Sequence, residues 1–411
     1  MSLLYNFIFP QDKKLFKYLF FLAFPVILSN ISRVVMRLTD TIMLKDFGSD
    51  QMGGAGYGGM IAWGAICLGI ALRTGTQTLV ARRLGQKKYD RCSIAFWNMQ
   101  LFAFIIGIPI TFLCFTYTNE INAFFLNLLQ TDLVSNSDTF KASITYGSIT
   151  FLGTYFMYIN FVFQGFYTGI EKTKVHMKAT ISSCLINLYL NIGFIYGTTF
   201  ISNPENNIIL SKLSFLWPSF IFQSEMLGVK GAAIGTLVAT ICMAIHYAIY
   251  LFDKTIITKY QIFKIRIHLA MLKKQIKLSF PVGVQEFLSM TSLIVFYSIL
   301  FKIGTIQNPA GPNYIMAATH VIFRIMHAAF MPAIGVGQAC ATLVGKFLGE
   351  KKPDKAESAI KESLRGSAYM MGIVGVIFIC FAQYIVPFFT NESQAVEIAV
   401  KGLRFVGCLQ L

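Results

Sequence analysis

Long apolar runs, each about the length of a membrane-spanning helix, recur along the whole chain. A helix needs about 20 mainly apolar residues to cross a bilayer. The short alternating segments typical of a transmembrane barrel are not found in the sequence. The pattern predicts an all-α integral membrane protein with spans at residues 15–44, 54–81, 93–117, 142–170, 175–200, 229–252, 275–302, 313–346, 362–389 and 394–411.

The apolar runs are arranged as an internal repeat. "LAFPVILSN" at 22–30 resembles "LSFPVGVQE" at 278–286, and "TLVARRLGQKKYDR" at 78–91 resembles "TLVGKFLGEKKPDK" at 342–355. Six spans precede the second copy, so both copies enter the membrane in the same orientation. This predicts two six-helix lobes related by a pseudo-two-fold axis along the membrane normal.

The repeat divides the chain into two lobes and a linker. We expect an N-lobe over 1–252 with spans one to six, a cytoplasmic linker over 253–274, and a C-lobe over 275–411 with spans seven to ten. The tenth span ends with the chain, so we expect the C-lobe to be incomplete. A truncated fragment is one interpretation of this ending.

Composition and charge support a membrane protein and predict its orientation. Of the 411 residues 55% are hydrophobic and 13% are charged, whereas soluble proteins carry about 25% charged residues. The net charge of +16 comes largely from the N-terminal segment and every second connection between spans, which together hold 24 of the 35 Lys and Arg residues. This positive-inside pattern places the N-terminus in the cytoplasm and the protein in the cell (inner or plasma) membrane. We therefore expect lipid, and no nucleic acid, as a partner.

The first span carries charges on one face. Asn30, Arg33, Arg37 and Asp40 share that face of a helix. A charge at the bilayer centre costs about 2.5–3.5 kcal/mol on insertion scales, so these side chains must face one another or water. One interpretation is an Arg37–Asp40 pair that only fixes packing. The other is a cavity in which Asp40 binds the coupling cation.

Further polar residues inside the spans predict a central cavity in each lobe. Pro25 and Pro281 each mark either a hinge or a static kink. For the remaining residues, a hydrogen bond between helices is the alternative to a role in a cavity. The N-lobe candidates are Tyr146, Asn160, Gln164, Asn187 and Asn191, and the C-lobe candidates are Glu286, His320 and Arg324.

Signatures of soluble enzymes and of resident cofactors are missing from the sequence. It contains no G-x-x-x-x-G-K-[ST] loop for ATP and no H-x-x-x-H zinc spacing. None of the eight cysteines forms a C-x-x-C pair, so they are read as packing residues. We expect neither an enzyme nor a metal site, and no cofactor beyond a coupling ion, H⁺ or Na⁺.

Three segments resemble the multidrug and toxic compound extrusion (MATE) transporters, with the first span closest to the DinF-like branch. They are "FPVILSNISRVVMRLTDTIMLKDFG" at 24–48, "GVKGAAIGTLVATI" at 228–241 and "AATHVIFRIMHAAFMPAIGVGQACATLVGKFLGEKKPDKAESA" at 317–359. The resemblance implies twelve spans in two lobes, and export of organic, usually cationic, compounds in exchange for Na⁺ or H⁺.

The resemblance also implies roles for single residues. It places Asp40 at the first-span coupling carboxylate and Pro25 at the bend of that helix. Asn187 and Asn191 stand where many members have Asn followed by Asp, so one carboxylate is missing here. Arg33 and Arg37 make the N-lobe cavity more positive than a cation exporter favours.

The resulting hypothesis is a monomeric secondary-active exporter of small organic molecules, working by cation antiport and alternating access. Two alternatives stay open. One is a flippase of the same superfamily for lipid-linked oligosaccharides or other anionic substrates, which would suit Arg33, Arg37, Arg73 and Arg324. The other is a truncated remnant that inserts into the membrane without transporting.

Overall fold

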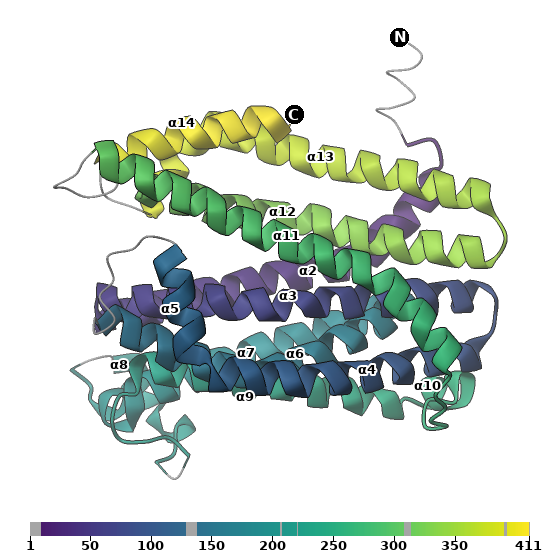
Figure 1. Ribbon diagram of the computed structural model, residues 1–411, viewed down its shortest axis with the longest axis horizontal. Helices are drawn as coiled ribbons and strands as arrows, with labels where there is room; N and C mark the ends of the chain where they lie inside the picture. Colours follow the sequence, from purple (N-terminus) through teal and green to yellow (C-terminus); the bar gives the residue numbers. More distant parts are fainter. Residues whose placement is uncertain are drawn as a thin grey trace.

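Every regular element in the described part of the chain is helical (Figure 1). The computed structural model describes residues 10–128, 138–205, 208–219, 221–307, 314–389 and 393–410. The α-helices are α2 (Lys13–Leu44), α3 (Ser49–Gly85), α4 (Tyr89–Thr116), α5 (Thr118–Leu128), α6 (Asp138–Gly169), α7 (Thr173–Ser202), α8 (Ile208–Lys212), α9 (Gly228–Ile249), α10 (Lys254–Tyr260), α11 (Leu269–Gln307), α12 (Tyr314–Gly349), α13 (Pro353–Ile385) and α14 (Ser393–Gln410). Four 3₁₀ turns accompany them: η1 (Lys45–Phe47), η2 (Ser214–Leu216), η3 (Tyr250–Phe252) and η4 (Val386–Phe388).

Each of the ten predicted spans coincides with a long helix, which confirms the predicted fold class. Among the described residues, eight helices are long and apolar enough to cross a membrane. The two predicted spans outside that set are α6 and α14. Every residue of α6 from Asn160 to Gly169 is buried by protein.

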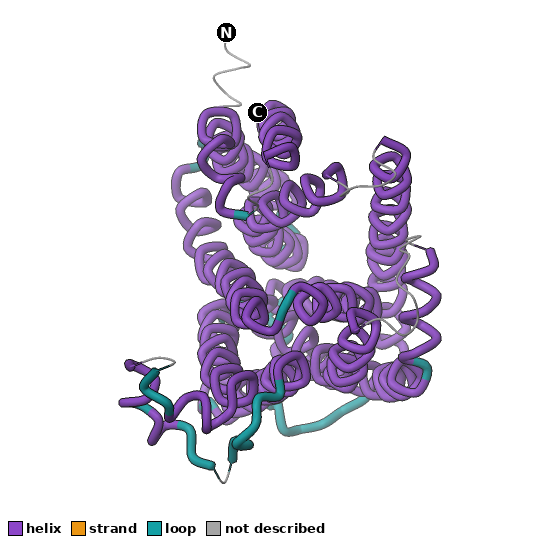
Figure 2. The backbone as a smooth tube through the Cα atoms, turned by 90° about the vertical axis from the view of Figure 1, so that its left-hand side faces the viewer, coloured by secondary structure: helices purple, strands orange, loops and turns teal. Residues whose placement is uncertain are grey.

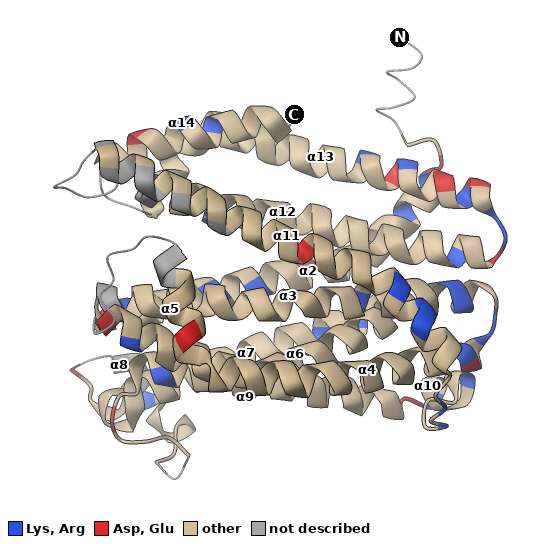
Figure 3. Ribbon diagram, in the orientation of Figure 1, with Lys and Arg blue, Asp and Glu red and all other residues tan. Residues whose placement is uncertain are grey.

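The helices form two groups with α2 between them. Figure 1 shows α12, α13 and α14 above α3 to α9, with α11 running obliquely from the upper group down to α10, and Figure 2 shows helices near the C-terminus above the larger group. Lys and Arg gather on the turns at the right-hand end of Figure 3. The division into N-lobe, linker and C-lobe stays a prediction.

The first half of α2 joins the two groups. Its side chains at Leu19, Leu22 and Ile27 pack against Val336 and Leu343 of α12 in one buried cluster. Asn30 continues this contact, donating from Nδ2 to the carbonyl of Met331 at 3.4 Å. Farther along α2, Arg37 is exposed on the same face, and His327 of α12 lies in its electrostatic field. The apolar packing of α2 against α12 is therefore followed by charged side chains in the second half of α2.

The repeated motif places two helices from different groups in close contact. A Cβ atom on Gly349 of α12 would lie 2.3 Å from the carbonyl oxygen of Arg82 in α3, and one on Gly85 would lie 2.0 Å from that of Lys346. Only glycine permits this approach of two backbones. Lys346 also pairs with Glu171 in the turn between α6 and α7, at 2.9 Å. The basic ends of the two groups are thus locked together.

The connecting segments are partly ordered against the bundle. The segment between α7 and α9 contains the short helix α8 and the turn η2. Its Trp217 is 7% exposed and donates from Nε1 to the carbonyl of Tyr189 at 2.9 Å. In the linker, hydrogen bonds lower the pKa of Asp253 to about 2, with the larger effect from Thr255 and the next from Lys172.

Candidate functional site

Asp40 lies buried at the contact between α2 and α7. Its Oδ1 accepts a hydrogen bond from Nδ2 of Asn191 at 2.6 Å, and the same amide reaches Oδ1 of Asn187 at 3.3 Å. Asn187 donates in turn to Oγ1 of Thr236 in α9 at 3.2 Å. The hydroxyl of Tyr146 in α6 interacts with Thr236 and lies in the field of Asp40. A polar network therefore connects α2, α6, α7 and α9.

One glycine makes room for this network. A Cβ atom on Gly235 would lie 2.1 Å from Oδ1 of Asn191. The side chain that holds Asp40 therefore occupies the space that any other residue at position 235 would fill. Sequence reasoning missed this position. The signal available was its place in the glycine-rich segment "GVKGAAIGTL".

The expected ion pair between Arg37 and Asp40 is wrong for this conformation. No such pair is found among the described residues. Arg37 instead places its guanidinium 4.6 Å from the centre of the Trp63 ring in α3. The carboxylate of Asp40 is hydrogen-bonded to Asn191 instead. Arg37 gains cation–π attraction from the Trp63 ring, which requires no anion. Arg33 donates from Nη2 to Oδ1 of Asn30 at 3.2 Å.

Asn160 and Gln164 face different partners. Asn160 donates from Nδ2 to the carbonyl of Thr240 in α9 at 3.0 Å. Gln164 donates from Nε2 to Oε1 of Gln338 in α12 at 3.2 Å, so it lies between the two groups of helices. Gln77 of α3 joins there, donating to the carbonyl of Gln338 at 2.6 Å. Gln77 and Gln338 were missed as a pair, because they are far apart in sequence.

The three C-lobe candidates do not form one cluster. His320 stacks on Tyr297 of α11 with ring centres 4.9 Å apart, and it lies in the field of the exposed Arg324. Glu286 of α11 instead interacts electrostatically with Arg73 of α3. Their role in a C-lobe cavity stays a prediction.

The two prolines lie inside continuous helices. Pro25 stands within α2 and Pro281 within α11, and neither helix is interrupted there. Ser29 donates from Oγ to the carbonyl of Pro25 at 2.8 Å. This is a local hydrogen bond from a helical serine to the carbonyl one turn earlier. Their role as hinges stays a prediction.

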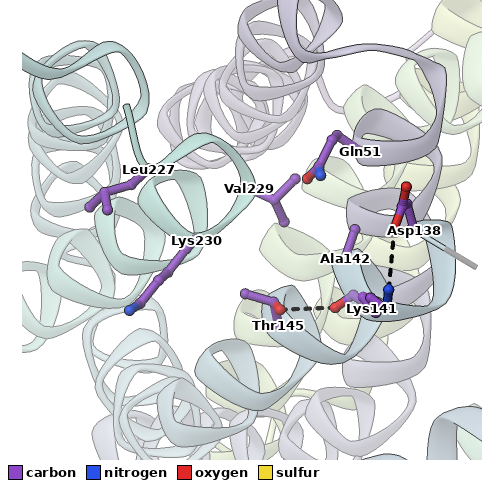
Figure 4. A pocket seen from close by; sticks show the side chains of 8 residues that line it. All are labelled: Gln51, Asp138, Lys141, Ala142, Thr145, Leu227, Val229 and Lys230. Carbon is purple, nitrogen blue, oxygen red and sulfur yellow. Dashed lines mark hydrogen bonds and ion pairs between the residues drawn. The ribbon is translucent and has the colours of Figure 1, made fainter. Parts of the chain in front are cut away.

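A cavity of about 190 Å³ lies where the first turns of α3, α6 and α9 meet (Figure 4). Lys141 is paired with Asp138 at its rim, 3.5 Å apart, with both side chains mostly exposed. The cavity was not expected from the sequence. It is lined by Gln51, Asp138, Lys141, Ala142, Thr145, Leu227, Val229 and Lys230.

A bundle of membrane-length helices with charged residues in its interior defines a multi-pass membrane protein. A model of the MatE family matches residues 25–192 and 286–411 of this chain. The chain therefore belongs to the MatE family.

Relatives and solved structures agree with this assignment. The chain is 23% identical over 396 residues to a probable multidrug resistance protein NorM of Thermotoga maritima, covering 95% of this chain and 75% of the relative. It is 22% identical over 384 residues to the probable multidrug resistance protein YoeA of Bacillus subtilis, covering 91% and 73%.

Among solved structures, an outward-facing multidrug resistance MATE family transporter of the MOP superfamily gives a TM-score of 0.79 at 20% identity. It matches 96% of this chain and 79% of that one. A MOP superfamily transporter from Pyrococcus furiosus gives a TM-score of 0.77 at 20% identity, and the match covers 96% of this chain and 79% of that one.

Proposed function

We propose that this chain is a secondary-active exporter of small organic compounds, exchanging its substrate for H⁺ or Na⁺ by alternating access. One observation carries the proposal: a carboxylate, Asp40, is buried inside the bundle and held by an amide, and no Lys or Arg among the described residues forms an ion pair with it. A buried carboxylate of this kind binds a proton or a metal cation readily, because the alternative is an isolated charge in a poorly solvated place. The relatives named multidrug resistance proteins support export.

The coupling step acts through α2. While Asp40 is ionised, it attracts the Asn191 amide and ties α2 to α7. A bound proton or Na⁺ neutralises the carboxylate, which weakens this charge-assisted hydrogen bond. Helix α2 is then free to bend at Pro25, where one backbone hydrogen bond is missing. Movement of α2 changes its contact with α12 and thereby the side on which the space between the lobes opens.

The orientation follows from the basic ends. Lys and Arg gather where α3 meets α12, so this closed end lies in the cytoplasm. The half of α2 that carries Arg37 and Asp40 then opens to the outside. We propose a monomer in the cell membrane with a cytoplasmic N-terminus, with lipid and substrate as its partners, acting as a transporter and not as an enzyme.

The test is proton- or Na⁺-driven uptake of a fluorescent organic dye into everted vesicles, with each gradient imposed separately. Asp40→Asn keeps the size of the side chain and removes its charge, so gradient-driven uptake is expected to fall to background. Asp46→Asn is the matched control, because Asp46 is an exposed carboxylate just past the same helix and bonds only to Tyr196 in the described contacts.

Two outcomes would contradict the proposal. Uptake by Asp40→Asn at the wild-type rate would remove the coupling role of this carboxylate. Absence of uptake by the wild-type chain, with every dye and either gradient, would instead support the remnant that does not transport.

A further inference from the structure

Three arginines inside the bundle lie within electrostatic range of one another, and one of them, Arg37, also lies in the field of Asp40. Arg33 and Arg37 lie on the charged face of α2, and Arg73 lies on α3. Arg33 acts electrostatically on both of the others. Three like charges repel one another. Among the described residues, the carboxylates of Asp40 and Glu286 act on Arg37 and Arg73 only through space, so the cluster keeps a net positive charge.

None of these arginines is paired with a carboxylate in the described part of the chain. Asp40 is held by Asn191, and Glu286 acts on Arg73 only through space. The Nε atom of Arg73 is buried without any hydrogen-bond partner. A buried donor of this kind is costly unless a ligand satisfies it.

A second unpartnered nitrogen lies in the same region. His176 of α7 is fully buried, and its Nδ1 is hydrogen-bonded to the hydroxyl of Tyr247. Its Nε2 has no partner. The charged side chains that act on this ring are Arg33 and Arg73. When Tyr247 donates to Nδ1, Nε2 carries the proton and adds a further donor to the cluster.

Solvent reaches the arginine cluster at Arg37, and the cluster lies opposite the exposed apolar stripe of α2. Arg37 is exposed, with the Trp63 ring of α3 beside its guanidinium. Tyr146 of α6 and His327 of α12 lie in its electrostatic field. At about 100° per residue, the charged face of α2 points nearly opposite to its outward apolar stripe. That stripe consists of Phe24, Ile31, Val35, Leu38 and Ile42, which are 37% to 68% exposed.

We propose that Arg33, Arg37 and Arg73 bind an anionic group, a carboxylate, phosphate or sulfonate, on an amphiphilic organic substrate. The planar guanidinium matches such groups with two parallel hydrogen bonds. The indole of Trp63 offers an aromatic surface to the apolar part of the same molecule. This inference rests on the proposed export function and names its substrate class.

The test is binding to the purified full chain in phosphatidylcholine nanodiscs, followed by fluorescence anisotropy. Carboxyfluorescein and rhodamine 6G share a ring system and carry opposite charge, so they separate charge from shape. Arg33→Gln and Arg73→Gln are each expected to raise the Kd for carboxyfluorescein by roughly tenfold to a hundredfold. The Kd for rhodamine 6G should stay the same or fall.

Arg82→Gln is the matched control. Arg82 is exposed at the far end of α3, so its loss changes the net charge equally and should leave both Kd values unchanged. Arg33→Lys keeps the charge without the planar fork, and it should show an intermediate Kd. This variant keeps the test decisive where Arg33→Gln fails to fold.

The outcomes separate this inference from export itself. If wild-type protein binds only rhodamine 6G, or if carboxyfluorescein binds equally well to all variants, the anion site is overturned. Transport of rhodamine 6G in vesicles would still support export. Phosphatidylglycerol added to the nanodiscs distinguishes the source. If phosphatidylglycerol weakens carboxyfluorescein binding to the wild type, the natural anion is a lipid headgroup. If it does not, the natural anion belongs to a soluble compound.

Discussion

At the scale of residues, the site depends on small distances between side chains from distant parts of the chain. Asp40 is bound by Asn191, 151 positions away. Spacing alone placed Asn30, Arg33, Arg37 and Asp40 on one helical face, because that requires only helical geometry. Spacing also suggested Arg37 as the partner of Asp40, since the two are three residues apart. The competing amide from α7 could not be seen in the sequence.

Gly235→Ala tests the importance of this fit. The new methyl group would lie 2.1 Å from Oδ1 of Asn191, so Asn191 must move away from Asp40. We expect gradient-driven dye uptake to fall and the protein to lose about 1–3 kcal/mol of stability, measured by vesicle uptake and thermal unfolding. Gly64→Ala is the control, because nothing lies within 4 Å of its added methyl group. Equal behaviour of the two variants would contradict the role of this contact.

At the scale of elements, α2 has two halves with different neighbours. Its first half packs against α12 in an apolar cluster, and its second half directs Asp40 toward α7. The sequence predicted the helix and the proline. It did not predict that one helix contacts both groups, because that depends on how helices distant in sequence pack together.

Lys346→Met tests the lock at the basic end. The Lys346–Glu171 pair is partly buried and 2.9 Å long, and a pair of this kind contributes about 1 kcal/mol. Its loss should change the ratio of closed to open states about fivefold. Spin labels on cysteines at positions 88 and 355, in a background without native cysteines, should report a larger population of long distances.

Lys352→Met provides the comparison for this variant, because Lys352 pairs with Glu350 on the exposed turn of α12 and α13. It should leave the distance distribution unchanged. If Lys346→Met also leaves it unchanged, the pair does not hold the basic end closed.

At the scale of the whole molecule, the distribution of charge sets the orientation in the membrane. The two copies of the repeated motif carry their basic residues on turns at one end of the bundle. Positive charge of this kind is retained in the cytoplasm during insertion. The charge pattern therefore predicts that both proposed lobes enter the membrane in the same sense.

Single cysteines in the background without native cysteines test this topology. In intact cells, a membrane-impermeant maleimide should label position 203, on the exposed turn after α7. It should label positions 88 and 352 only after the cells are made permeable. Labelling of all three positions to the same extent in sealed cells would contradict the orientation.

The sequence by itself determined the helices and the face that each charge occupies, and it indicated the orientation. These depend on hydropathy, on the 3.6-residue period and on charge at the ends of spans, all of which are local. Only the tertiary structure decided that Asn191 rather than Arg37 binds Asp40, that Gln164 reaches α12, and that Arg33, Arg37 and Arg73 share one region. Such contacts depend on helix crossings, and these are set by small residues such as Gly85, Gly235 and Gly349 whose neighbours lie far away in the chain.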